Sequence, residues 1–118
     1  MEKVIKIGEQ DVKVKSSAAI PHIYRRRFGR DIFVDMGQIM KKFNPDKPSE
    51  ITVDSLEIFE NLAYCFARHA APEEVPDDIE VWLEQFEIFD IYNALPEIFD
   101  MWIKDNHTTG RLKKNNDK

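Results

Sequence analysis

The sequence has few of the residues from which catalytic, metal and phosphate sites are usually built. Its 118 residues include one cysteine, four glycines and three histidines. The lone Cys65 excludes an internal disulfide and is typical of a protein in a reducing cytoplasm. The scattered glycines form neither common type of phosphate-binding loop, and His22, His69 and His107 lack the HxxxH or HExxH spacing of a metal site. We therefore expect no enzymatic activity, no metal and no cofactor.

Long hydrophobic runs are also missing. No apolar stretch approaches the ~20 residues that cross a membrane, and the N-terminus MEKVIKIGEQ contains no apolar signal segment. Charged residues make up 33% of the chain and apolar residues 42%, which is typical of a soluble globular protein. The length suits one domain. These features predict a small cytoplasmic domain that does not associate with membranes.

Positive charge is missing from residues 78–102, where seven acidic side chains are interspersed with large apolar ones. The apolar positions follow the spacing of an amphipathic helix. So many aromatic side chains beside uncompensated negative charge favour a surface that binds another protein. Plain core packing is the alternative, and we expect it for most of these aromatic side chains. The candidate contact residues in this segment are Trp82, Phe86, Phe89 and Trp102.

Charge is unevenly distributed along the chain. Residues 1–59 carry 11 Lys and Arg against 9 Asp and Glu, whereas residues 60–118 carry 6 against 13. A basic cluster in the first half is therefore far along the sequence from the acidic segment. Two separately solvated faces are one interpretation. The other is weak head-to-tail self-association, for which the candidate basic contacts are Arg25, Arg26, Arg27 and Arg30.

The periodicity predicts a mainly α fold with a small N-terminal β-hairpin. Ile5 and Ile7 alternate with lysine, as do Val12 and Val14, and residues 8–11 supply the loop. The pattern then becomes helical and predicts about five helices. Residues 1–105 are expected to form one compact domain, and residues 106–118 a disordered polar tail.

Local signals predict where the helices begin and end. Gly29 is placed to end the first helix in the left-handed conformation. Pro96 predicts a kink in the last helix, or a break near Asn93. The expected N-caps are Ser16 or Ser17, Asp31, Asp54 with Glu57, and Asp77 with Glu80.

Two apolar stripes, each on its own helix, are predicted to face the core. Cys65 lies on the same helix as the second stripe. The first stripe comprises Ile32, Met36, Ile39, Met40 and Phe43. The second comprises Leu56, Phe59, Leu62, Ala63, Phe66, Ala67 and Ala70.

The arginine cluster also raises the question of DNA binding. A helix that ends in three arginines, a glycine turn and a second helix have the outline of a helix-turn-helix. A recognition helix must offer polar or basic side chains to the bases, but residues 32–36 are apolar or acidic. The net charge of −5 also opposes binding to a polyanion. A small helical DNA-binding or regulatory protein is therefore the second hypothesis.

Three blocks that follow the hairpin in order together resemble a known family. They are IYRRRFGRDIFVDM, LEIFENLAYCFARHA and WLEQFEIFDIYNALPEIFDMW. This set is similar to the tail assembly chaperones of long-tailed phages and prophages of Gram-positive bacteria. The resemblance covers residues 1–104, and its most specific parts are residues 24–31 and 82–102.

The resemblance implies a non-enzymatic protein of the infected cell's cytoplasm that is absent from the mature virion. Such a chaperone binds the tape measure protein and recruits tail tube subunits around it. Members of the family are largely helical and assemble into spirals. In this context, the second hypothesis becomes a DNA-binding regulator of a prophage.

Overall fold

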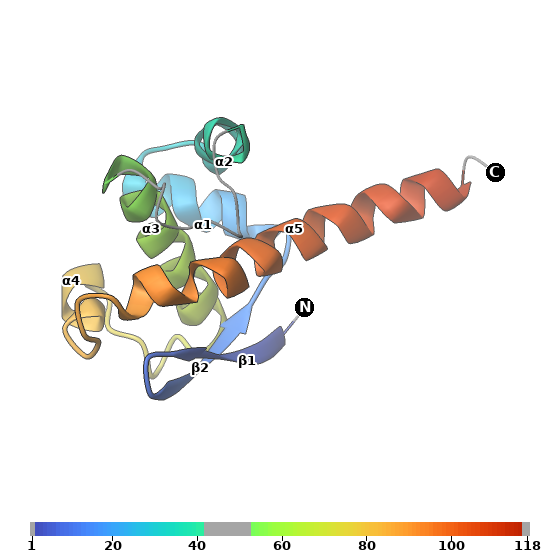
Figure 1. Ribbon diagram of the computed structural model, residues 1–118. Coiled ribbons are helices and arrows are strands. Elements are labelled where there is room, and N and C mark those ends of the chain that lie inside the picture. The colour runs from blue at the N-terminus through green and yellow to red at the C-terminus, as the bar shows by residue number, and fades with distance from the viewer. Residues whose placement is uncertain (1, 42–52, 117–118) are drawn as a thin grey trace.

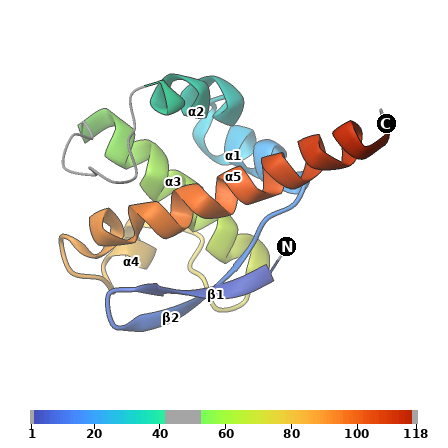
Figure 2. The same cartoon turned by 45° about the vertical axis from the view of Figure 1, so that its right-hand side comes forward.

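The chain forms a two-stranded antiparallel hairpin followed by five helices, which confirms the predicted fold class (Figure 1). This computed structural model describes the backbone of residues 2–41 and 53–116 and the side chains of residues 2–41 and 55–103. The predicted core position Phe43 lies outside the described residues. In both views the hairpin lies on one side of α3 and α5, with α1 and α2 on the other (Figures 1 and 2).

The hairpin pairs β1 (Glu2–Ile7) with β2 (Gln10–Lys15), and Ile5 lies opposite Val12. Alternate residues of a strand point to opposite faces, and on the inner face Ile5, Ile7 and Val14 are buried. Only two residues connect the strands, because Gln10 pairs with Ile7. The predicted loop of residues 8–11 is therefore two residues too long.

Gly8 in this loop has a backbone conformation and a neighbour that disfavour a side chain. Its φ is 66°, and a β-carbon built on it would collide with the Asp90 carboxylate. We expect Gly8→Ala to lower the free energy of unfolding by about 1–2 kcal/mol, because alanine is strained at positive φ. Urea denaturation followed by circular dichroism measures this.

Gly37→Ala is the matched control for Gly8→Ala, since a β-carbon added at Gly37 meets nothing within 4 Å. Gly37 lies inside a helix, where replacement of glycine by alanine stabilises by about 0.5–1 kcal/mol. Equal effects of the two substitutions would contradict the argument from the positive φ of Gly8.

The ends of the first two helices confirm two of the predicted local signals. Helix α1 (Ala19–Phe28) ends at Gly29, whose φ is 66° and whose N–H donates to the Arg25 carbonyl. Helix α2 (Ile32–Met40) begins after Asp31, whose carboxylate accepts from the N–H groups of Phe33 and Val34. The N-cap position of α1 is Ala18, so the prediction that Ser16 or Ser17 occupies this position is wrong. The Ser17 hydroxyl nevertheless accepts a hydrogen bond from the Ala19 N–H.

Helix α3 (Val53–Ala70) is the centre of the fold and contacts β2 and all four other helices. Its first residue precedes the predicted cap Asp54, whose side chain lies outside the described residues. The predicted stripe is buried along most of its length, but the neighbouring Tyr64 and Cys65 are fully buried as well. Residues 62–67 of α3 are therefore covered on all sides, whereas Glu57 nearer its start is exposed. This follows from the position of α3 between the hairpin and the other helices.

The acidic segment forms two helices, which residues 84–89 separate. Helix α4 (Ile79–Leu83) begins after Asp78, which accepts from the Glu80 N–H, so the predicted cap at Asp77 is wrong by one residue. After a short loop, α5 (Asp90–Asn116) continues through Pro96 without the predicted break near Asn93. Within a helix, proline removes its own N–H donor, and its ring crowds the carbonyl four residues earlier, here that of Tyr92. Buried residues on both sides of Pro96, including Leu95 and Ile98, hold the helix against the core.

Helix α5 also continues through the predicted domain boundary at residue 105 to Asn116. Its last part extends away from the other elements in both views (Figures 1 and 2). The helix thus includes residues 106–116. Disorder of this polar tail stays a prediction. No helix in the described part of the chain combines the length and apolar character of a membrane span.

Candidate functional site

Two of the four candidate arginines are held by contacts within the chain. Arg27, on α1, donates to the Asp77 carbonyl at 2.9 Å and to the Asp77 carboxylate at 2.7 Å. Its guanidinium carbon lies 5.3 Å from the centre of the Tyr64 ring. The hydrogen bond from Arg27 lowers the pKa of Asp77 below its ordinary value. Arg27 therefore joins α1 to the connection between α3 and α4.

Arg30 is held by a carboxylate that the sequence did not single out. Its Nε and Nη2 donate to the two oxygens of Asp35 at 2.8 and 2.9 Å. Asp35 is buried on the inner side of α2 and also accepts from the Tyr24 hydroxyl at 2.9 Å. The hydrogen bonds from Arg30 lower the pKa of Asp35, which burial opposes. The only signal in the sequence was an aspartate beside Met36 in an apolar stripe.

The other two arginines are exposed and weakly engaged. The Arg25 guanidinium lies 3.5 Å from the Nδ1 atom of His22. The Arg26 side chain makes no hydrogen bond or ion pair with any residue for which the structure describes a side chain. Arg26 and Arg27 face a pocket of about 510 Å³, called the arginine pocket below. Its lining residues are Ile23, Arg26, Arg27, Arg68, His69, Pro72 and Asp77.

His69 contributes to the arginine pocket mainly as a neutral group. Its Nε2 lies 2.9 Å from the Ser17 hydroxyl oxygen. Burial, and then the charge of Lys15, lower the pKa of His69 below its ordinary value of 6.5. The positive charge of the pocket at neutral pH therefore comes from its three arginines.

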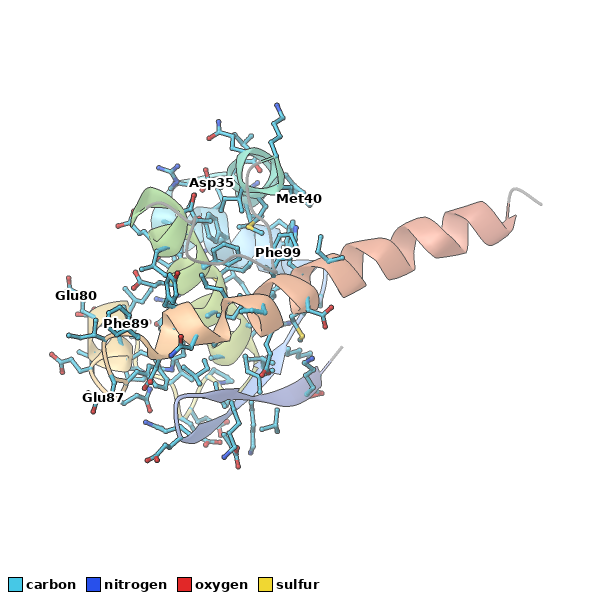
Figure 3. The ribbon with its side chains drawn as sticks, in the orientation of Figure 1. Asp35, Met40, Glu80, Glu87, Phe89 and Phe99 are labelled. Carbon is cyan, nitrogen blue, oxygen red and sulfur yellow. The ribbon has the colours of Figure 1, made fainter. Side chains whose placement is uncertain are left out.

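The opposite charge gathers where α4 leads into α5. Ile88 and Phe89 are 88% and 67% exposed, unusually large values for apolar side chains. Figure 3 places Glu80, Glu87 and Phe89 at the same end of the molecule. We call this surface the acidic apolar end, and its exposed residues are Glu80, Val81, Glu84, Glu87, Ile88 and Phe89.

The four aromatic candidates have different surroundings. Trp82 is buried, and its ring packs edge-on against Tyr64 and against Phe86, which is half-buried. Trp102 is 5% exposed. In this conformation the two tryptophans offer almost no surface to a partner. Phe89 alone among the four is largely exposed.

Helix α2 carries a second exposed apolar surface that the sequence analysis missed. Ile32, Met36 and Ile39 face the core, as predicted. Met40, placed in the same stripe, is instead 50% exposed, because the turn of the helix carries it past the core-facing side. Phe33 and Val34 are each 56% exposed, and the Phe33 ring lies 5.6 Å from that of Trp102. The sequence contained one signal for this surface. Phe33 and Val34 are adjacent apolar residues in a helix that buries only one of its faces, so they cannot both face the core.

The residues whose side chains are described contain no group of three or more His, Cys, Asp or Glu placed to hold a metal ion. Cys65 is fully buried in α3, and burial raises the pKa of its thiol to about 12. Comparisons of the chain with family models, curated proteins and solved structures found no match.

Proposed function

We propose that the chain is a non-enzymatic phage tail assembly chaperone. It binds the tape measure protein and recruits tail tube subunits in the cytoplasm of the bacterial host, and it is absent from the mature virion. The three sequence blocks suggest this identity. The observation that supports protein binding most strongly is the exposure of Ile88 and Phe89 among glutamates.

The acidic apolar end has the chemistry of a surface for an amphipathic helix. Full burial of a side chain such as Ile or Phe contributes roughly 1.5–3 kcal/mol, so covering two of them stabilises a complex substantially. The glutamates would pair with basic residues at the edge of the partner's apolar stripe. Tape measure proteins are long and helical, and their apolar stripes need cover before the tail tube closes around them. Helix-in-groove contacts provide such cover.

The exposed arginines favour a second, weaker contact between copies of the chain. Arg25 and Arg26 are exposed on α1, and the acidic apolar end lies on other elements. Surfaces of opposite charge on different elements permit head-to-tail association between copies. Exposed ion pairs contribute only about 0–1 kcal/mol each, so this association is expected to be weak and salt-sensitive.

The surroundings of the arginines make DNA binding the less favoured function. Asp77 and Asp35 engage Arg27 and Arg30, and the start of α2 exposes Phe33 and Val34. Of the four arginines, only Arg25 and Arg26 therefore remain to neutralise phosphates, and apolar side chains occupy the positions that would contact bases.

Co-expression with the tape measure protein from the same phage or prophage genome tests the proposal. We expect a soluble complex with the wild-type chain and its loss in the double variant Ile88→Ser/Phe89→Ser, because that variant removes the exposed apolar contact. Val4→Ser is the matched control, since Val4 is 57% exposed but lies on β1. An insoluble tape measure protein beside a folded wild-type chain would contradict the proposal. Micromolar binding to duplex DNA would favour the prophage regulator.

A further inference from the structure

The arginine pocket already holds one carboxylate, that of Asp77. The Asp77 Oδ1 atom lies 2.7 Å from Arg27 Nη2 and 3.4 Å from Arg68 Nη2. The Asp77 side chain is nevertheless 83% exposed. A carboxylate held by two guanidinium groups but open to solvent can be replaced by another that approaches from outside, because both make the same kind of charge-assisted hydrogen bonds.

The pocket has more positive charge than Asp77 neutralises. Arg26, Arg27 and Arg68 line it against this single carboxylate. Arg26 makes no hydrogen bond or ion pair with a described side chain, so its donors are available to a ligand. Ile23 and Pro72 add apolar surface to the lining. A ligand that satisfies these groups carries a carboxylate next to an apolar side chain.

The chain itself presents such a ligand at its acidic apolar end. Glu84 and Glu87 are exposed there beside Ile88 and Phe89. Residues 84–89 contain no lysine or arginine that would be repelled by the pocket. A nucleic-acid phosphate fits less well, because it carries no apolar side chain beside its charge that could cover Ile23 and Pro72.

We propose that the arginine pocket is a carboxylate-binding site for residues 84–89 of a second copy, and that Asp77 is an internal competitor for that site. The incoming glutamate takes the place of the Asp77 carboxylate on Arg27 and Arg68 and also engages Arg26. Competition by Asp77 keeps the contact between copies weak and reversible. This inference rests on the self-association part of the proposed function and names its two surfaces.

Binding of a labelled peptide to the full chain tests the site. The probe is a fluorescein-labelled peptide of residues 84–89, EQFEIF, followed by fluorescence anisotropy. Asp77→Asn keeps the shape and the carbonyl acceptor of Asp77 but removes its charge, so we expect about two- to fivefold tighter binding. Arg26→Ala is expected to weaken binding by a similar factor. Higher salt is expected to weaken binding to the wild-type chain.

Two controls make this result specific to the pocket. Lys41→Ala removes an exposed cation at the end of α2, which does not line the pocket, and should leave the affinity unchanged. The peptide QQFQIF, which lacks both carboxylates, should not bind. Circular dichroism of each variant confirms that it is folded. Unchanged or weaker peptide binding in Asp77→Asn would overturn the proposal, as would displacement of the peptide by duplex DNA at physiological salt.

Mixing two variants of the whole chain tests the contact between copies. Arg26→Glu disables the pocket, and Glu84→Lys/Glu87→Lys disables the acidic apolar end. Each variant alone should remain monomeric at concentrations where the wild type associates, whereas the mixture should form 1:1 dimers, because one intact pocket meets one intact end. Sedimentation velocity measures the masses. A monomeric mixture, or continued association of either variant alone, would overturn the proposal.

Neither measurement contains the tape measure protein. Failure of the pocket therefore shows itself in the peptide and mixing experiments, whereas failure of the chaperone function shows itself in the co-expression experiment.

Discussion

Replacement of Trp82 by alanine is expected to lower the free energy of unfolding by about 3–5 kcal/mol, the range for removal of a buried aromatic side chain. Trp82 is 2% exposed. Its ring centroid lies 5.6 Å from that of Tyr64 and 5.0 Å from that of Phe86, both in edge-on geometry. The substitution leaves a cavity between α4 and α3 and removes both ring contacts. Guanidinium chloride denaturation followed by circular dichroism measures the loss.

Phe89→Ala is the matched control, because it removes an aromatic ring from the same segment. Phe89 is 67% exposed, and substitutions at such surface positions usually change stability by within about 0.5 kcal/mol. In the co-expression experiment, Phe89→Ala should instead weaken the complex with the tape measure protein. Similar losses of stability in the two variants would show that the assigned division between core and surface is wrong.

Replacement of Asp35 by alanine is expected to lower the free energy of unfolding by about 2–4 kcal/mol. Asp35 accepts hydrogen bonds from the Tyr24 hydroxyl and from the Arg30 guanidinium. Its removal leaves the hydroxyl of the fully buried Tyr24 without this acceptor. Arg30 is half-exposed and can turn toward water, so the loss is smaller than for a fully buried ion pair. Urea denaturation measures the effect.

A surface carboxylate and the pH dependence provide controls for the Asp35 result. Asp11→Ala removes an exposed ion pair with Lys6 at 3.6 Å and should cost at most about 1 kcal/mol. The folded-state pKa of Asp35 is lowered from the ordinary 3.8. Its stabilising contribution is therefore fully present above that value and is lost as the pH falls through the lowered pKa. A stability difference between wild type and Asp35→Asn that does not shrink in acid would contradict this assignment.

The hydrogen bonds that Asp35 accepts from Tyr24 and Arg30 also explain why the two helices after the hairpin have a fixed arrangement. Tyr24 lies on α1, Asp35 on α2, and Arg30 in the turn between them. One buried carboxylate thus links both helices and their connection. The same contacts reduce the number of arginines available to a partner. The sequence marked four arginines as equivalent. Among them, Arg26 is exposed, lines the arginine pocket, and has a side chain that bonds to no described side chain.

The sequence by itself determined the elements whose causes are local. Alternation of Ile and Lys over a few residues was sufficient for the hairpin, since side chains of a strand point to opposite faces in turn. Gly29 and Asp31 fixed the end of one helix and the start of the next, because a left-handed turn and a carboxylate cap act within one helical turn. The number of helices followed from the same kind of signal.

Tertiary structure decided which residues of the candidate site are available to a partner. Arg27 and Asp77 are 50 residues apart in the chain, so no local pattern showed that they would pair. The acidic segment has a helical period throughout, yet its loop between α4 and α5 turns Phe89 outward, while Trp82 packs under Tyr64 of α3. Burial of an aromatic residue depends on what packs over it from distant segments. Local sequence places a side chain on one face of a helix, but only the packed fold covers that face.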